Sequence, residues 1–195
     1  MTPRVVDEPG VGVQHVWDLP TETDTLLAII TDLFTGYRQH MHFGVLLQGA
    51  AREVAAPSAP TKISMPDGYV TVDFGRWHFH LCIGEHTGSG PELGRIRRTA
   101  RAELYRGIGR DDTPTTWGLR LFNGRDEQQM TIMLPNPFLT DTQDIVDEPD
   151  FSRLAAWDHL RITHLELPPD PYDRAGKGFR HDWRLARAGR DSPAR

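Results

Sequence analysis

Three histidines and the only cysteine of the chain lie within ten residues, in the stretch WHFHLCIGEH at positions 77–86. His78 and His80 are two residues apart, so in a β-strand both imidazoles would lie on the same face, as a metal-binding H-x-H pair requires. His86 follows six residues later and can supply a third imidazole. The stretch predicts one divalent metal ion bound by these three histidines, with a coordination position open to water or substrate. The alternative is a set of polar residues on a solvated sheet face.

Three other polar residues can assist such a metal site. A two-residue turn at Gly75-Arg76 would place Asp73 opposite His78, where its carboxylate can orient the imidazole. Tyr69 lies across the same hairpin, and Glu85 lies close along the chain. We therefore expect Asp73 to support the metal ligands, and we expect Tyr69 and Glu85 to be catalytic residues that move a proton.

The metal and the reaction stay open at this stage. Three neutral imidazoles suit Fe, Cu or Zn, and affinity alone does not choose among these ions. Iron or copper would support an oxidation by dioxygen, whereas zinc would support hydrolysis or elimination through a metal-bound hydroxide. The absence of a paired catalytic carboxylate favours oxidation. The leading prediction is a small-molecule metalloenzyme, an oxidoreductase using dioxygen; the alternatives are a zinc-dependent hydrolase or lyase and a non-catalytic ligand-binding domain.

An arginine-rich segment after the histidines indicates an acidic substrate. If residues 89–107 form a helix with an apolar stripe, Arg97 lies beside that stripe and Arg101 at its border. A guanidinium drawn toward a core needs a carboxylate or a bound anion, so both arginines are candidates for substrate binding. The same position predicts that Arg97 is less exposed than Arg95 and Arg98. A structural ion pair is the alternative.

The segment GKGFRHDW near the C-terminal end offers one further candidate. It places His181 next to glycines that permit close approach, so the segment can act as a lid with His181 contacting the substrate. The alternative is a simple terminal loop.

Two hairpins are expected to position these residues. YVTVDF and WHFHLC alternate apolar and polar residues around the Gly75-Arg76 turn, which pairs Val72 with Phe79 and leaves the histidines on the polar face. TTWGLRLF and QMTIML form the second hairpin, in which Leu119 pairs with Ile132 across a loop of about six residues.

The remaining elements follow from helical and strand patterns. Apolar residues at three- and four-residue spacing predict a helix over 21–37, and cap-type residues around Ser89 predict the helix over 89–107. RITHLEL, at 161–167, fits a strand, and the segment 50–68 fits an exposed loop. No strand–helix–strand crossover repeats, so we expect an α+β fold whose antiparallel sheet is built from two β-hairpins with flanking helices. We divide the chain into an N-terminal extension (1–20), a single domain (21–167) and a C-terminal tail (168–195).

Composition restricts the partners. Formal net charge is −5, and acidic and basic residues are interleaved, which argues against nucleic acid. No apolar run is long enough to span a membrane, and the first residues lack the apolar core of a secretory signal, so we expect a cytoplasmic protein. With one cysteine, Cys82, any metal must be held mostly by histidine and carboxylate. The expected partner is a small-molecule substrate, and the oligomeric state stays open.

Overall fold

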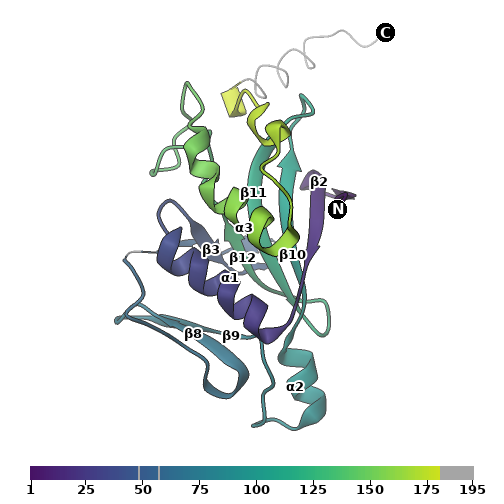
Figure 1. The fold of residues 1–195 in the computed structure, drawn as a ribbon, viewed down its shortest axis with the longest axis vertical. Helices are drawn as coiled ribbons and strands as arrows, with labels where there is room; N and C mark the ends of the chain where they lie inside the picture. The colour runs from purple at the N-terminus through teal and green to yellow at the C-terminus, as the bar shows by residue number, and fades with distance from the viewer. Residues whose placement is uncertain (48, 57, 181–195) are drawn as a thin grey trace. The chain divides into compact units, whose positions relative to one another are not determined.

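The structure, a computed structural model, describes residues 1–47, 49–56 and 58–180 (Figure 1). It contains helices and antiparallel sheets, as an α+β fold requires. The helices are α1 (Thr23–Gly36), α2 (Pro91–Arg97) and α3 (Ala155–Leu165), and the single-turn helices are η1 (Pro66–Gly68), η2 (Phe151–Leu154) and η3 (Pro171–Arg174). The strands are β1 (Arg4–Glu8), β2 (Gly12–Leu19), β3 (His42–Gly44), β4 (Leu46–Leu47), β5 (Ala50–Ala51), β6 (Val54–Ala55), β7 (Lys62–Ser64), β8 (Tyr69–Asp73), β9 (His78–Cys82), β10 (Thr99–Ile108), β11 (Pro114–Asn123) and β12 (Gln128–Met133).

The described strands form three sheets. The largest has the order β1-β2-β10-β11-β12-β3-β6, and the other two are β4-β5 and β7-β8-β9. The two hairpins expected from the sequence therefore belong to different sheets. None of the helices in the described ranges is long and apolar enough to cross a membrane.

Contacts divide the chain into two compact units, which we describe separately. Unit 1 comprises residues 1–17, 105–117 and the described residues from 134 onward. Unit 2 comprises residues 18–104 and 118–133, and the strands β10 and β11 pass through both units. The expectation of a single domain over 21–167 stays a prediction.

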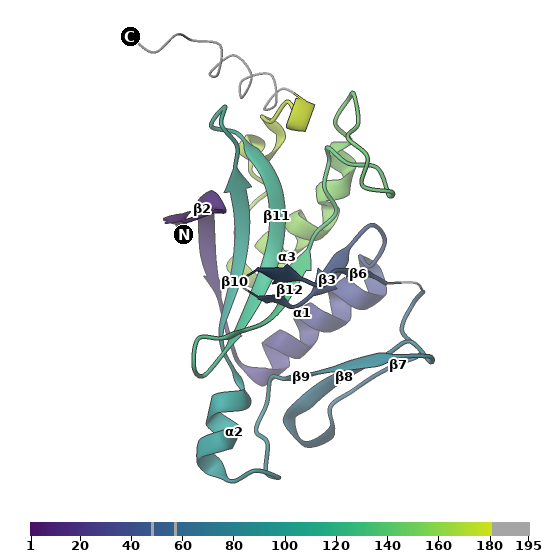
Figure 2. The ribbon, with the colours of Figure 1, turned by 180° about the vertical axis from the view of Figure 1, so that it is seen from behind.

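The core of unit 2 forms where α1 packs against β3 and β9 (Figures 1 and 2). Apolar residues at helical spacing put one face of α1 in the core, which confirms the predicted helix. The ring of Phe34 lies 4.9 Å from that of Phe43 and 5.3 Å from that of Phe79. This aromatic contact anchors one face of the β8–β9 hairpin, so the hairpin's other face is left for polar residues.

The register of the β8–β9 hairpin confirms the prediction. Val72 pairs with Phe79, Asp73 pairs with His78, and the Phe74 N–H donates to the Trp77 carbonyl at 3.0 Å. Gly75 has φ +85°, a conformation that glycine adopts without strain in a tight turn. The turn therefore sets which side chains share the histidine face.

The second hairpin, β11–β12, also follows the expected pairing. Leu119 pairs with Ile132 and Leu121 with Met130. A bulge after Leu121 shifts the register, so that Phe122 pairs with Gln128 and the connecting loop is shorter than expected.

Unit 1 contains the β1–β2 hairpin and α3, so the residues expected as an N-terminal extension pair as strands. Trp17 of β2 contacts Trp157 of α3 edge to face, with ring centroids 5.7 Å apart. Trp117 of β11 and Trp157 are fully buried. These indoles form the centre of the unit's core.

One helix prediction and one strand prediction are wrong. The helix expected over 89–107 ends at Arg97, and β10 begins at Thr99. The strand expected over 161–167 is mostly part of α3, which ends at Leu165. In the first segment the charged residues Glu103 and Arg106 are buried in β10, which hides the strand pattern. In the second, the buried residues Trp157, Leu160, Arg161 and Leu165 have the spacing of a helix that begins before the segment. The segment 50–68, expected as a loop, contains β5, β6, β7 and η1 among its described residues.

Candidate functional site

The histidine pair of β9 lies on the polar face of its hairpin. His78 and His80 are exposed, and their rings meet edge to face with centroids 4.8 Å apart. Nδ1 of His80 lies 2.7 Å from the Thr71 hydroxyl across the hairpin. Asp73 is opposite His78 as predicted, but its Oδ1 accepts the N–H of Gly75 at 2.7 Å. This carboxylate oxygen therefore stabilises the turn.

His86 has different partners from the other two histidines. Its Nδ1 lies 2.7 Å from Oδ2 of Asp67, and its ring is edge-on to Tyr69 at 5.0 Å between centroids. A guanidinium nitrogen of Arg97 lies 3.4 Å from Nε2. Because arginine can only donate, this contact requires Nε2 to be an acceptor and Nδ1 to carry the proton toward the carboxylate.

A tight turn brings Asp67 to His86 from 19 residues away. Asp67 and Gly68 in η1 both have positive φ, at 45° and 80°. The Gly68 carbonyl accepts the N–H groups of Ile83 and Gly84, at 3.0 and 2.8 Å. A Cβ on Gly68 would lie 2.2 Å from the Glu85 carbonyl oxygen, so only glycine permits this approach of the two segments.

The hydrogen bonds around Asp67 favour its ionised form. Its Oδ1 accepts the Thr87 backbone N–H at 2.9 Å and the Thr87 hydroxyl at 2.7 Å. These bonds, and to a smaller extent the nearby His86, lower the pKa of Asp67 to about 2. Asp67 is therefore a carboxylate at neutral pH, beside an imidazole side chain that is only 13% exposed.

Arg97 is more exposed than predicted. It is exposed whereas Arg98 is half-buried, because α2 ends at Arg97 and the expected apolar stripe does not continue. The Arg97 guanidinium donates to the Ser89 hydroxyl at 2.8 Å, and the Arg97 carbonyl accepts from the Gln129 side chain at 2.8 Å. Ser89 and Gln129 thus hold Arg97 beside Nε2 of His86 through neutral groups.

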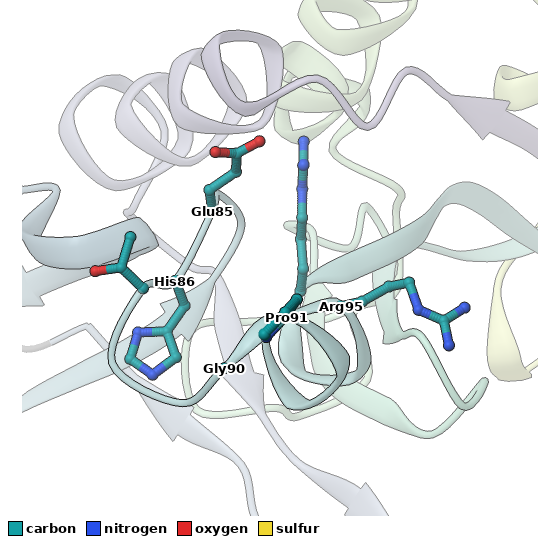
Figure 3. A pocket seen from close by; sticks show the side chains of 8 residues that line it. Glu85, His86, Gly90, Pro91 and Arg95 are labelled. Atoms are coloured by element: carbon teal, nitrogen blue, oxygen red, sulfur yellow. The ribbon is translucent and has the colours of Figure 1, made fainter.

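A pocket of about 530 Å³ lies beside His86. Figure 3 shows the Glu85 carboxylate and the His86 imidazole directed to different sides of their loop, and the Arg95 guanidinium directed away from His86. The lining includes Arg98 and the backbone of the loop that leads into α2. The lining residues are Glu85, His86, Thr87, Gly90, Pro91, Gly94, Arg95 and Arg98.

One family model matches residues 3–166, and its description is a family of unknown function (DUF7676). The chain belongs to this family. The DUF7676 match includes both hairpins, α1, α2 and every residue that lines the pocket, and it ends before η3. A search of curated proteins found no match.

Of the other two residues expected to bind substrate in this DUF7676 chain, the structure describes Arg101 and places it outside the lining of the pocket. Arg101, on β10, forms an ion pair with Glu103 and contacts Asp126 at 2.5 Å, and its guanidinium stacks 3.6 Å above the Phe122 ring. Arg101 thus has the structural ion pairs of the alternative interpretation, and its substrate role stays a prediction. His181 lies outside the described residues.

The three histidines are not gathered around one point. In the described part of the DUF7676 chain, no group of three or more His, Cys, Asp or Glu side chains is placed to hold a metal ion. Metal binding by His78, His80 and His86 therefore stays a prediction. Cys82, the last residue of β9, is buried; burial raises the pKa of its thiol, which lies 3.7 Å from the Gly84 carbonyl oxygen.

The sequence reasoning missed Asp67, Thr87 and Ser89 as neighbours of the candidate site. Asp67 belongs to the segment expected as an exposed loop. The one signal for it was the Pro66-Asp67-Gly68 sequence, because proline, aspartate and glycine together are typical of a tight turn.

Proposed function

We propose that the chain is an enzyme that binds an acidic small molecule beside His86 and transfers a proton by means of the Asp67–His86 pair. The supporting observation is the 2.7 Å contact between Nδ1 of His86 and the Asp67 carboxylate, at the wall of a pocket. A carboxylate in this position fixes the imidazole tautomer and stabilises the imidazolium that forms when Nε2 accepts a proton.

The arginines near the pocket support an anionic substrate. Arg95 and Arg98 line the pocket, and Arg97 lies next to Nε2 of His86. The Arg97 guanidinium lies 3.4 Å from Nε2 and occupies the side on which Nε2 would meet a substrate proton. An anionic group that draws Arg97 away would therefore both anchor the substrate and free Nε2 to act as a base. Glu85, also in the lining, is a second candidate for moving a proton.

Proton exchange with deuterium oxide tests this proposal whatever the overall reaction is. The protein is incubated with a panel of 2-oxo acids, 3-oxo acids and dicarboxylic acids, and loss of the proton next to the carbonyl or carboxyl group is followed by NMR. For an acid that exchanges, His86→Gln should reduce the rate at least about 100-fold. Asp67→Asn should reduce it less, because the imidazole remains. His159→Gln, on α3, is the control, and the acid should exchange its proton at the wild-type rate in the presence of this variant.

A non-catalytic ligand-binding domain would give a different pattern. Calorimetry would then show that an acid binds and that its binding depends on the arginines. No acid of the panel would exchange its proton for deuterium. Exchange that persists in His86→Gln would contradict the proposed role of His86.

Metal-dependent chemistry is the second candidate, favoured by the adjacent rings of His78 and His80. It comprises dioxygen-dependent oxidation with iron or copper and hydrolysis or elimination with zinc. Elemental analysis of protein purified without a histidine tag tests it. His78→Gln distinguishes the candidates: it should remove metal and activity if His78 is a ligand, but should leave proton exchange intact if the Asp67–His86 pair acts alone.

The proposal retains the remaining expectations from the sequence. These are a cytoplasmic location, a small molecule rather than nucleic acid or a membrane as partner, and one domain with helices flanking the two hairpins. Fractionation of cells and analytical ultracentrifugation of the purified chain test the location and the oligomeric state.

A further inference from the structure

Unit 1 contains a carboxylate that is completely buried. The side chain of Asp173, in η3, is 0% exposed. Its oxygens accept hydrogen bonds from the Arg106 guanidinium at 2.8 Å, the Trp117 indole at 3.0 Å and the Trp157 indole at 2.7 Å. Three donors around one carboxylate are enough to offset its desolvation, which would otherwise be costly.

The donors and the carboxylate come from different parts of the chain. Arg106 lies on β10, Trp117 on β11 and Trp157 on α3, and all three fall within the residues matched by the family model. Asp173 lies beyond the matched residues, in a segment of residues 168–176 that we call the strap. The donor set thus belongs to the framework of unit 1, and the strap supplies only the acceptor.

The chemistry of the donors specifies an anion with two oxygens. Indole nitrogens and a guanidinium donate and cannot accept, so their partner must be an acceptor, and the positive charge of the guanidinium favours an anion. The three donor residues are 4% exposed or less, which makes an unfilled site unfavourable. Arg106 has two further partners: its Nε donates to His15 at 3.2 Å, and the nitrogen that reaches Asp173 also donates to Asp170 of the strap at 2.8 Å.

We propose that Arg106, Trp117 and Trp157 form a carboxylate-binding pocket, and that Asp173 is its built-in ligand and fastens the strap to unit 1. The ligand class is a small carboxylate the size of an aspartate side chain. The strap has other polar contacts: Asp170, which is 28% exposed, pairs with Arg106 at 2.8 Å, and the Pro168 carbonyl accepts from Arg161 at 3.3 Å. Tyr172 donates to the Asp112 carbonyl at 2.5 Å, and Arg174 pairs with Asp158 at 2.5 Å. Of the strap's carboxylates in these contacts, Asp173 is the one that is completely buried, so we expect it to contribute most to the attachment.

Chemical rescue of the full-length Asp173→Ala variant tests the pocket. Loss of a buried charged partner should lower the midpoint of thermal unfolding by about 10 °C. Replacing chloride by about 0.1 M formate or acetate at equal ionic strength should restore several degrees, because the anion binds only the folded form. The wild type, whose pocket is filled, should show no carboxylate-specific gain. Asp158→Ala, which removes an ion pair of the strap outside the pocket, is the matched control and should show none either.

The experiment gives a result even if Asp173→Ala does not fold in chloride. Refolding from urea in formate but not in chloride would then support the pocket. Equal behaviour of Asp173→Ala in formate, acetate and chloride, folded or unfolded, would overturn the proposal.

Limited trypsin digestion tests the attachment of the strap. Arg174 and Lys177 are exposed trypsin sites in or next to the strap. Cleavage there should be at least about tenfold faster in Asp173→Ala than in the wild type, because local opening becomes easier. Cleavage at the wild-type rate in a folded Asp173→Ala protein would show that Asp173 does not fasten the strap.

Discussion

At the scale of single residues, Asp67 has a consequence for acid stability. Its pKa is about 2 in the folded protein and 3.8 ordinarily, so the folded state binds its proton less readily than the unfolded chain. The stability that Asp67 contributes is fully present above its ordinary pKa and is lost as the pH falls through about 2. Asp67→Asn should remove this contribution while keeping an acceptor for Thr87.

The measurement is urea unfolding of the wild type and of Asp67→Asn at several pH values from about 5 down to about 2. The wild type should lose more stability over this range than the variant does. Parallel pH profiles for the two proteins would mean that the Thr87 hydrogen bonds do not favour the carboxylate as described.

Arg97 gives the second prediction at this scale. Arg97→Lys keeps the charge but loses the planar guanidinium, which binds carboxylates through paired hydrogen bonds. We expect about tenfold weaker binding of the acid that exchanges fastest in deuterium oxide, with an unchanged midpoint of unfolding. Calorimetry measures the affinity. Arg76→Lys, an exposed arginine in the β8–β9 turn, is the control; equal affinities for the two variants would exclude Arg97 as an anchor.

At the scale of elements, the contact between η1 and the loop after β9 is the feature that assembles the candidate site. Gly68→Ala should displace η1, because the new Cβ would lie 2.2 Å from the Glu85 carbonyl oxygen at a φ of +80°. The expected loss of stability is about 2 kcal/mol or more, and the Asp67–His86 contact should be lost with it.

Gly10→Ala is the matched control for this prediction. Gly10 has nearly the same φ, +82°, but nothing lies within 4 Å of its Cβ position. It should show the backbone cost alone, about 1 kcal/mol. Urea unfolding gives both values, and NMR of the His86 ring reports on the contact. A Gly68→Ala protein as stable as Gly10→Ala would show that the close approach is not needed.

Some of these elements could be predicted from the sequence because their patterns are local. In the β8–β9 hairpin the alternation and the Gly75-Arg76 turn agree, so the register follows. In β10 the local pattern does not indicate a strand, because Glu103 and Arg106 occupy buried positions where apolar residues are expected. Both can be buried because each pairs with an oppositely charged residue that is distant in sequence. A partner far along the chain leaves no local signal.

The candidate site also contains features that the sequence could predict and features that it could not. His86 could be selected as a candidate residue from its position on a glycine-flanked loop, and its role stays a prediction. Its contact with Asp67 could not, because it depends on positive φ at two successive residues of η1 and on how that turn meets the chain after β9. The grouping of His86 with His78 and His80 rested on distance along the chain, which does not fix where a ring points.

At the scale of the whole molecule, the strands β10 and β11 each contribute residues to both units. The boundary falls inside both strands, between Leu104 and Tyr105 and between Trp117 and Gly118. The boundary also divides β2, between Trp17 and Asp18, so unfolding one unit alone would break three continuous strands. We therefore expect one cooperative unfolding transition.

Native-state hydrogen exchange tests this at increasing denaturant. The slowest amides of α1, in unit 2, and of α3, in unit 1, should report the same free energy of opening. A lower value for one of the two helices would show that its unit opens independently.

The buried thiol of Cys82 can report on local opening of the chain around β9. Because it is the only cysteine and is 3% exposed, an alkylating reagent can reach it only during the moments when β9 separates from its neighbours. The rate of alkylation in native buffer is divided by the rate for an unfolded chain. When closing is faster than alkylation, this ratio gives the fraction of time for which the strand before His86 is open. No cysteine needs to be introduced, and no other thiol of the chain competes for the reagent.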